Sequence, residues 1–539
     1  MEWQHGDLID AIAPLIPADA PATIHGDKII YWPEFNRRTN AMARNLIEMG
    51  IGPGAKVGFY MRNMPNYTET LAACFRARLV HVNVNYRYQT DELHYIFDNS
   101  DSEVVVYDPE FADKIAELQP RLPSVKAWVE INNHAPLAND FAIAYESLTE
   151  GDGSNLDIKR SPDDMLFIYT GGTTGMPKGV MWRVQDLRQA QLDAASVMGP
   201  QPMTLEEHIE RVKEFIEIGL PRAIPACPLM HGTGLFSAMG AIIGGGAIAT
   251  LPTMNHFDPA ELLQQAEQHK ITAMAIVGDA FAKPMLQTLE ENPGKYDLSS
   301  LETITSSGTM WSREVKQGIL KHIPEVTLSD SFGASEAVGF GYSLTTAEGE
   351  TQTAKFQVTE FCKVFSEDDR EIEPGSGEKG FIARAGCIPV GYYKDEKKTA
   401  ETFKTIDGVR YSIPGDWCTV EKDGTLTLLG RGSVCINTAG EKVFPEEVEE
   451  TLKEHPAVQD ALVVGVPDDK WGNAVTGVVQ LNAGVNAGED ELRAHVRDNL
   501  AGYKVPKRIL MRDDLKRAPN GKADYKGTTQ FALESLGLA

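Results

Sequence analysis

The sequence predicts a mixed α/β protein built on parallel sheets flanked by helices. Three short apolar runs, at residues 166–169, 271–277 and 326–328, lead into Gly, Ser, Thr or Asp, as buried strands do where they pass into loops. Residues 259–269 and 313–322 repeat apolar positions every three or four residues, which is the period of a helix packed on one face. Because strand and helix patterns alternate, we expect parallel strands with ligand loops at their ends.

One segment between these elements needs a separate explanation. Residues 230–256 carry no Asp, Glu, Lys or Arg, and a run of that length could cross a bilayer. Gly244, Gly245, Gly246 and Pro252 interrupt the run. We therefore expect a buried helix, a glycine turn and a buried strand, and no integral membrane association.

The pattern changes toward the C-terminus. Residues 419–429 alternate apolar and polar side chains around Asp423-Gly424, which predicts an antiparallel hairpin. A helix start at 444–447, a strand at 460–466 and a helix at 489–500 follow, and together they make a unit of ordinary domain size. We predict two domains, 1–432 and 433–539.

Composition excludes several classes of protein. The chain has 539 residues with 51 Lys plus Arg against 77 Asp plus Glu, a formal net charge of −26, so a nucleic acid partner is not expected. The six cysteines are widely spaced and form no zinc pattern. The first residues resemble no signal peptide. These observations predict a cytoplasmic protein with reduced thiols.

A glycine- and threonine-rich loop follows the strand at 166–169. Glycines admit close backbone approach, and hydroxyls with one lysine can meet an anion, so the loop suits phosphates. It is not a Walker A loop, because Lys178 precedes Gly179 where Ser or Thr would be needed. On composition alone, a plain glycine-rich turn stays open. The residues that we predict to contact phosphate are Thr170, Gly171, Gly172, Thr173, Thr174, Gly175 and Lys178.

The loop resembles the phosphate-binding signature of the adenylate-forming enzymes, which include acyl-CoA synthetases, luciferases and peptide-synthetase adenylation domains. The resemblance continues in order over most of the chain, through the segments at 228–234, 330–336, 391–393, 415–416, 430–431, 465–468 and 519–522. Residues 432–437 resemble bacterial acyl-CoA synthetases for medium- to long-chain or steroid side-chain acids. The family implies a large N-terminal region of two α/β subdomains and a β-barrel, followed by a small mobile α+β domain.

The family also implies the reaction. A carboxylate attacks the α-phosphate of ATP, pyrophosphate leaves, and the thiol of CoA then displaces AMP from the acyl adenylate. ATP, Mg²⁺ and CoA are therefore the expected cofactors and co-substrates. Positioned cations and hydrogen-bond donors, rather than a protein nucleophile, should stabilise the charge that develops.

Catalytic roles are carried over residue by residue. Lys522 matches the lysine that reaches the carboxylate and the α-phosphate, although from its local sequence alone it is a solvated surface lysine. Thr170 matches a phosphate-loop hydroxyl, and Glu336 matches the glutamate that holds Mg²⁺. A structural ion pair stays the alternative for Glu336.

Nucleotide and acid contacts follow in the same way. Asp416 matches the aspartate that accepts hydrogen bonds from the ribose hydroxyls, and Arg431 matches a neighbouring ribose and phosphate contact. Phe332 stands where tyrosine is common, and Ser335 where threonine is common. The further nucleotide contacts implied are Ser306, Ser307, Gly308, Asp330, Ser331, Gly333 and Ala334. The acid pocket implied contains His231 as a gate, Gly232, Phe281, Gly308 and Gly339.

Several matters stay open on sequence alone. Ser433 stands at the family's hinge position, which is commonly Asp or Lys. The acyl acceptor could be a carrier protein rather than CoA, and a non-catalytic nucleotide or acyl binder is the rival from another class. Neither the acid nor assembly as a homodimer is settled by the sequence.

Overall fold

The structure of the chain is a computed structural model. It describes residues 3–170, 176–196, 199–309, 311–349, 355–431, 434–438, 441–468, 472–500, 502–518 and 521–538. Two compact units are defined by their internal contacts. Unit 1 comprises residues 1–351 and 385–412, and unit 2 comprises residues 352–384 and 413–539.

Unit 1 contains an eight-stranded sheet that is parallel except at one edge. Strand β8 pairs in parallel with β4, whereas β9 pairs antiparallel with both β8 and β19. In sheet order the strands are β19 (Gly391–Tyr392), β9 (Lys178–Arg183), β8 (Met165–Thr170), β4 (Val80–Asn83), β3 (Lys56–Tyr60), β5 (Ser102–Tyr107), β6 (Ala127–Glu130) and β7 (Ile143–Ala144).

A second set of strands in unit 1 is also largely parallel. Strands β1, β11, β10, β12, β13 and β14 pair in parallel in that order, and β2 and β15 add antiparallel partners at the two ends. Their bounds are β2 (Lys28–Tyr31), β1 (Pro21–His25), β11 (Ala247–Thr250), β10 (Arg222–Pro225), β12 (Ala273–Ile276), β13 (Thr303–Ser307), β14 (Thr327–Ala334) and β15 (Ala337–Thr345). The hairpin β20 (Phe403–Ile406) and β21 (Val409–Ser412) also belongs to unit 1.

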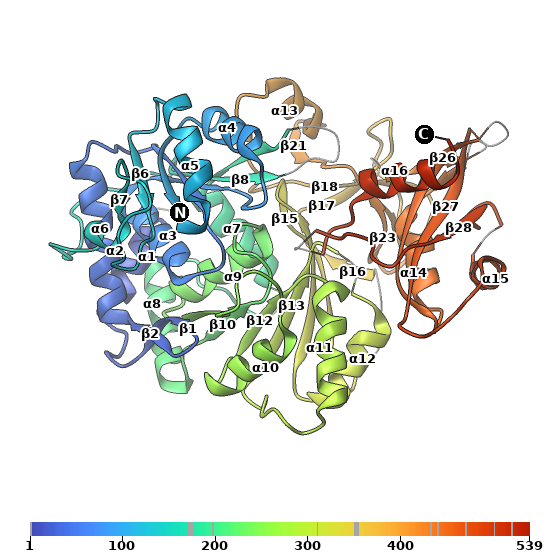
Figure 1. The fold of residues 1–539 in the computed structure, drawn as a ribbon, viewed down its shortest axis with the longest axis horizontal. Helices are drawn as coiled ribbons and strands as arrows, with labels where there is room; N and C mark the ends of the chain where they lie inside the picture. The colour runs from blue at the N-terminus through green and yellow to red at the C-terminus, as the bar shows by residue number, and fades with distance from the viewer. Residues whose placement is uncertain are drawn as a thin grey trace. The chain divides into compact units, whose positions relative to one another are not determined.

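Helices connect these strands and cover their apolar side chains. Figure 1 shows α10, α11 and α12 next to the strands β12 and β13 that they connect. The helices of unit 1 are α1 (His5–Ile12), α2 (Trp32–Glu48), α3 (Pro65–Ala77), α4 (Thr90–Asn99), α5 (Ala112–Leu118), α6 (Tyr145–Leu148), α7 (Val184–Ala195), α8 (Leu205–Ile218), α9 (Gly232–Ile243), α10 (Pro259–Gln268), α11 (Asp279–Glu291), α12 (Arg313–His322) and α13 (Glu396–Thr402).

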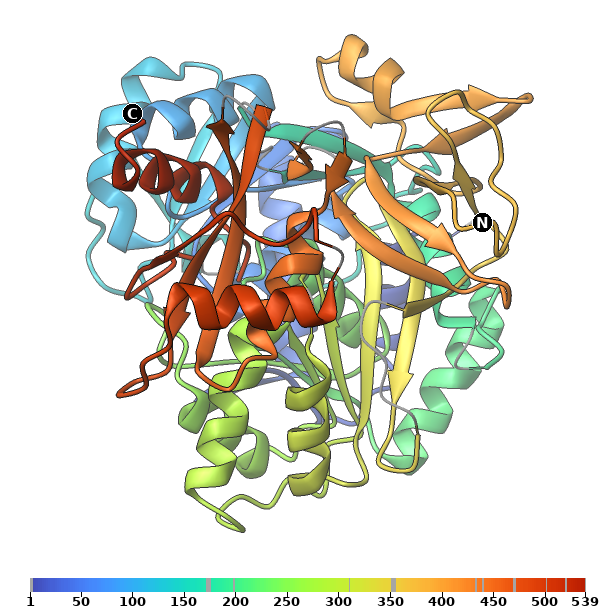
Figure 2. The same cartoon turned by 90° about the vertical axis from the view of Figure 1, so that its right-hand side faces the viewer.

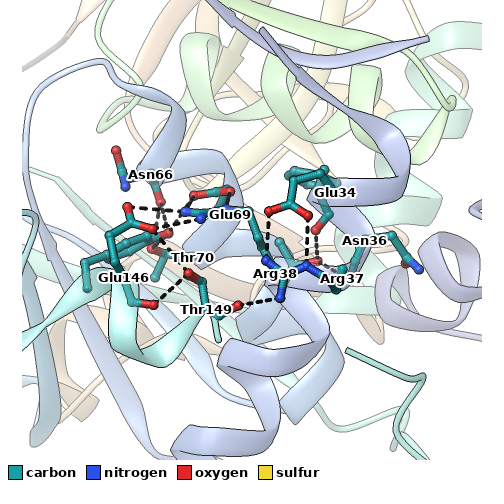
Figure 3. A network of polar contacts seen from close by, with 12 residues as sticks. Glu34, Asn36, Arg37, Arg38, Asn66, Glu69, Thr70, Glu146 and Thr149 are labelled. Atoms are coloured by element: carbon teal, nitrogen blue, oxygen red, sulfur yellow. Dashed lines mark hydrogen bonds and ion pairs between the residues drawn. The ribbon is translucent and has the colours of Figure 1, made fainter. Parts of the chain in front are cut away.

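A polar network joins three helices of unit 1 inside this apolar setting (Figure 3). Arg38 on α2 donates to Glu69 on α3 at 2.5 Å and to Glu146 on α6 at 2.8 Å. The Glu69 side chain is 1% exposed, and Tyr145 donates a further hydrogen bond to it at 3.2 Å. Two carboxylates and a forked guanidinium satisfy one another here, which allows charge to be buried between helices.

Unit 2 contains two antiparallel arrangements. The first pairs β16 (Lys355–Val358) with β23 (Leu426–Arg431), β23 with β22 (Asp416–Val420), β22 with β18 (Lys379–Arg384), and β18 with β17 (Cys362–Phe365). The second has the order β25 (Glu441–Val443), β24 (Ile436–Thr438), β27 (Gly472–Leu481) and β26 (Val458–Asp468), with β28 (Arg508–Met511) parallel to β27.

The second sheet of unit 2 has a helical layer on each face. Val463 on β26 packs in one apolar cluster with α14 (Pro445–Lys453) and α15 (Glu489–Asn499). The alternate residues Leu462 and Val464 pack in another cluster with α16 (Tyr525–Ser535), which Figure 2 shows in dark red beside the strands. Because neighbouring strand residues point to opposite faces, one continuous strand serves both clusters.

Most sequence-based expectations for the fold are confirmed. Helix α12 has the predicted bounds, the segment 230–256 forms α9, a glycine turn and β11, and the hairpin around Asp423-Gly424 is present. No helix in the described parts of the chain has both the length and the apolar character needed to cross a bilayer. The division into compact units does not follow the predicted boundary; residues 432 and 433 lie outside the described residues, and that boundary and the β-barrel stay predictions.

Candidate active site

The predicted phosphate loop connects the antiparallel strands β8 and β9. Thr170, the last residue of β8, lies opposite Lys178, the first residue of β9. The loop residues Gly171, Gly172, Thr173, Thr174 and Gly175 lie outside the described residues. The Lys178 amine pairs with the Asp395 carboxylate at the start of α13, and this contact holds the pKa of Asp395 below its usual range. Lys178 is therefore positioned by a partner from α13.

Asn83 connects the end of β8 to the segment before α9. Its amide donates to the carbonyl oxygens of Tyr169 at 2.9 Å and Met230 at 2.8 Å, and its Oδ1 accepts from the Tyr169 backbone N–H at 2.6 Å. The side chain is buried at the end of β4. Sequence reasoning missed this residue; the available signal was a polar side chain at the end of an apolar strand, where ligand loops are expected.

His231, the predicted gate, is the N-cap residue of α9, and Gly232 begins the helix. Both residues are half-buried. Gly234 allows the first turn of α9 to pack closely against the backbone of Pro228, since a Cβ at this position would lie 2.5 Å from the Pro228 carbonyl oxygen. Asn63 also holds the backbone just before His231, because its Oδ1 accepts from the Leu229 backbone N–H at 2.7 Å.

Two predicted residues stabilise the local backbone. The hydroxyl of Ser306, at the end of β13, accepts from the Gly278 backbone N–H at 2.9 Å and is fully buried. Gly278 has φ of 52°, a conformation that glycine adopts without strain, and it precedes α11. Phe281 on α11 is buried with its ring 4.8 Å from that of Phe257. Gly308, with φ of 94°, follows β13 directly.

The hairpin β14–β15 brings most of the remaining predicted contacts together. In register, Ser306 of β13 lies beside Asp330 of β14, and Ser307 lies beside Ser331. Phe332 is nearly buried, and its ring packs 5.2 Å from that of Phe340. The predicted residues Gly333 and Ala334 lie next to an irregularity in the strand pairing, and Gly339 on β15 has φ of 73°. The tip of the hairpin carries Ser335 and Glu336.

Asp330 is part of a buried ion pair. Its carboxylate contacts the amine of Lys316 on α12, whose side chain is 0% exposed. Burial raises the pKa of Asp330 to about 6, and the Lys316 charge opposes that rise. The pair links α12 to the strand that carries the predicted nucleotide contacts.

Glu336 is held in one orientation. Its Oε1 accepts from the Tyr392 hydroxyl at 2.7 Å, and its backbone carbonyl oxygen accepts from the Ser412 hydroxyl at 2.6 Å. The Trp182 indole N–H donates at 2.8 Å to the carbonyl oxygen of Ser335, so a β9 side chain reaches the same hairpin tip. Within the described part of the chain, Glu336 Oε2 has no partner.

These observations fit the expected magnesium ion. One carboxylate oxygen is oriented by Tyr392 and the other is open, and Mg²⁺ is commonly held by one or two carboxylates with substrate phosphates and water. Among the residues that the structure describes, no three or more His, Cys, Asp or Glu side chains form a metal-binding cluster. Glu336 therefore suits a metal held largely by the nucleotide.

Unit 2 carries the remaining predicted residues. Asp416 is buried at the start of β22, opposite Arg431 of β23, whose side chain lies outside the described part. Lys522 is exposed, and its carbonyl oxygen accepts from the Ala518 backbone N–H at 2.9 Å. Arg517 donates to the neighbouring Gly521 carbonyl oxygen at 3.1 Å and to the Asp460 carboxylate at 2.5 Å.

Comparison with known proteins gives close relatives over the full length. The chain is 42% identical to a 3-oxocholest-4-en-26-oate–CoA ligase of Rhodococcus rhodochrous, over 99% of this chain and 96% of that protein. It is 39% identical to a medium/long-chain-fatty-acid–CoA/3-oxocholest-4-en-26-oate–CoA ligase of Mycolicibacterium smegmatis, over 96% of this chain and 95% of that protein.

Solved structures share the fold at lower identity. The anthranilate CoA ligase AuaEII in complex with anthranoyl-AMP has a TM-score of 0.84 at 19% identity, covering 100% of this chain and 98% of that one. ATP-bound MatB from Rhodopseudomonas palustris has a TM-score of 0.80 at 21% identity, covering 99% of this chain and 100% of that one. Family models for the AMP-binding enzyme and its C-terminal domain match residues 14–391 and 447–522. The chain belongs to the AMP-binding enzyme family and is an AMP-forming acyl-CoA ligase that uses ATP and CoA.

Proposed function

We propose that this ligase activates apolar carboxylic acids of the steroid side-chain and medium- to long-chain fatty classes. The observation that carries this proposal is the 38–42% identity, over nearly the whole chain, to ligases whose names specify those acids. In the first half-reaction the acid's carboxylate oxygen bonds to the α-phosphorus of ATP and the bond to pyrophosphate breaks. In the second, the CoA sulfur bonds to the acyl carbon, AMP leaves, and the thiol proton passes to solvent.

Lys522 is proposed as the cation that pairs with the carboxylate and the α-phosphate during adenylation. Its support is its match to the family motif and its exposed position next to Gly521, whose carbonyl oxygen accepts a hydrogen bond from Arg517. Thr170 and the residues Gly171, Gly172, Thr173, Thr174, Gly175 and Lys178 are proposed to contact the phosphates. Backbone N–H groups and hydroxyls in such a loop can donate hydrogen bonds to phosphate oxygens.

Glu336 is proposed to hold Mg²⁺ through its open oxygen. When bound, the ion would neutralise phosphate charge and favour departure of pyrophosphate. Tyr392 restricts the carboxylate to one orientation, so less rotational freedom is lost on binding.

Asp416 and Arg431 are proposed as ribose and phosphate contacts. A buried carboxylate accepts two hydroxyl hydrogen bonds strongly, because its charge assists both. Phe332 would present a ring face to adenine. We propose that segments 306–308 and 330–335 lie next to the adenine. His231, Gly232, Phe281, Gly308 and Gly339 are proposed to border the acid.

Three further features are proposals of the same kind. Domains 1–432 and 433–539 would reorient about Ser433 between the half-reactions, since a hinge needs only residues that tolerate a backbone change. The protein would act in the cytoplasm and as a homodimer. Transfer to a carrier protein instead of CoA is the second candidate, but the curated relatives above are named as CoA ligases.

Product analysis by mass spectrometry tests the proposal. Purified protein is incubated with ATP, Mg²⁺, CoA and a panel of fatty, aromatic and steroid acids. AMP with a steroid or fatty acyl-CoA is expected. Acyl adenylate without thioester would favour a carrier protein, and conversion of aromatic acids alone would contradict the proposed acid class.

A further inference from the structure

Two hydrogen-bonded contacts join the loop after β12 to the loop after β13. The Gly278 backbone N–H donates to the Ser306 hydroxyl at 2.9 Å. The Oδ1 of Asp279, the first residue of α11, accepts from both the backbone N–H of Ser312 at 2.9 Å and its hydroxyl at 3.1 Å. Strands β12 and β13 are parallel neighbours, so these loops leave the same edge of the sheet, where α/β proteins place their ligands.

Ser312 makes its contact with Asp279 in place of a local one. It is the N-cap residue of α12, a position that suits serine because the hydroxyl oxygen can accept from a backbone N–H of the first turn. Here the hydroxyl makes no capping bond of this kind and donates to Asp279 instead. The Ser312 side chain therefore stabilises the spacing between two helices rather than the start of one.

Asp279 is also held by its own helix. Its Oδ2 lies 3.6 Å from the amine of Lys283, one turn further along α11, and its side chain is 12% exposed. Trp311, next to Ser312, is buried in the same apolar cluster as Phe281 of α11. A carboxylate that is already oriented loses little conformational freedom when it accepts the two Ser312 hydrogen bonds, so the contact fixes the loop efficiently.

The contacts bracket residues that we propose to border the acid and the adenine. Ser306 and Ser312 are both nearly buried, whereas between them Ser307 and Thr309 are half-buried and Gly308 is exposed. The loop after β13 is thus anchored at both ends and accessible between its anchors. Accessible residues on an anchored loop are suited to contact a ligand in a fixed geometry.

We propose that Asp279 is a positioning residue for acid binding. By holding Ser312, it fixes the loop that carries Gly308 relative to the start of α11, where Phe281 lies. The inference rests on the proposed function, which assigns Gly308 and Phe281 to the acid. Without the contact the loop adopts further arrangements, and only the fraction of molecules in the competent one binds the acid at full affinity. The acid then binds more weakly, while the complex, once formed, reacts as before.

A second role of an acidic residue at this position has to be separated from positioning. A carboxylate in the first turn of a helix interacts favourably with the helix dipole through its charge. Asp279→Asn removes the charge but keeps an oxygen that accepts from Ser312, whereas Asp279→Ala removes both. Positioning predicts that the Asn variant preserves acid binding, and a pure charge effect predicts that it does not.

Steady-state kinetics with dodecanoate and with 3-oxocholest-4-en-26-oate, at saturating ATP, Mg²⁺ and CoA, test the inference. Asp279→Ala should raise the KM for the acid about tenfold and change kcat by less than about twofold, as loss of hydrogen bonds to a charged acceptor predicts. Asp279→Asn should stay within about twofold of the wild-type KM, and Ser312→Ala, which retains its backbone donor, should raise KM about threefold. A merely structural role would lower the active fraction, and hence kcat, without changing KM.

Asp297→Ala is the matched control. The Asp297 Oδ1 accepts from the Ser299 backbone N–H at 3.2 Å and from its hydroxyl at 2.6 Å, which is the same pair of bonds at exposed positions before β13. This variant should leave the KM for the acid unchanged.

Each outcome bears on the inference. An unchanged acid KM in Asp279→Ala, or an Asn variant as impaired as the Ala variant, overturns it while the proposed function stands. If Asp279→Ala does not fold, an unchanged KM in Ser312→Ala overturns the inference by itself. Conversion of neither acid by the wild-type protein overturns the proposed function and this inference together.

Discussion

The buried pair of Lys316 and Asp330 makes a quantitative prediction about stability. Lys316→Met removes the cation and leaves a carboxylate that is largely buried. Breaking a buried pair in this way costs about 3–5 kcal/mol of unfolding free energy at neutral pH. The double variant Lys316→Met/Asp330→Leu should regain most of the loss, because apolar side chains of similar volume replace such pairs at little cost.

The pH dependence follows from the raised pKa of Asp330. Its folded-state pKa of about 6 lies above the ordinary value of 3.8, so the folded protein takes up a proton as the pH falls through that range. Once the carboxyl is neutral, loss of Lys316 matters less. The destabilisation by Lys316→Met should therefore be smaller at about pH 5 than at about pH 8.

Urea unfolding followed by circular dichroism at both pH values measures the effect. The control is Lys321→Met, since Lys321 is an exposed lysine on the same helix. Equal destabilisation by Lys316→Met at the two pH values, or a double variant no more stable than the single one, would refute the ion-pair argument.

Three further predictions concern the site and unit 2. Lys522→Ala should reduce acyl-adenylate formation much more than thioester formation from supplied acyl adenylate; equal losses would contradict its proposed role. Asn83→Ala should lower unfolding stability by about 1–3 kcal/mol and reduce turnover, because buried groups of Tyr169 and Met230 lose their partner, and an unchanged melting temperature would count against this. Burial raises the pKa of the Glu449 carboxyl to about 8 from 4.5, so between those pH values the folded protein holds a proton that the unfolded chain has lost, and the free energy of unfolding falls as the pH rises. Glu449→Gln should remove that fall, whereas Glu454→Gln, at an exposed position, should retain it. A fall that persists in Glu449→Gln would show that Glu449 does not cause it.

Local patterns predicted the elements well. The amphipathic period at 313–322 predicts α12, because that pattern depends only on residues within about two helical turns of one another. The hairpin at 419–429 is equally local, since Gly424 adopts φ of 82° in its turn. Such elements need no information from elsewhere in the chain.

The missed features of the site depend on distant residues. Asn83 and Met230 are 147 positions apart in the sequence, and Tyr392 and Glu336 are 56 positions apart. No local pattern encodes these contacts, because they arise from the packing of complete strands and helices. From the sequence pattern alone, Lys316 would be expected on the solvent-exposed face of an amphipathic helix. Only the position of β14 in the folded protein shows that its amine contacts Asp330.

The order of segments in the two units has a consequence for biosynthesis. Unit 2 draws its strands β17 and β18 from 352–384 but their neighbour β22 from beyond residue 413. These strands leave the ribosome before unit 1 receives its last segment, 385–412. At about 5–20 residues per second, the stretch from the end of β18 at Arg384 to the end of β22 at Val420 takes about 2 to 7 s to synthesise. Until then β18 has an unpaired edge, the kind of surface on which nascent chains aggregate. Slow translation through this region should therefore increase the demand of this ligase for chaperones.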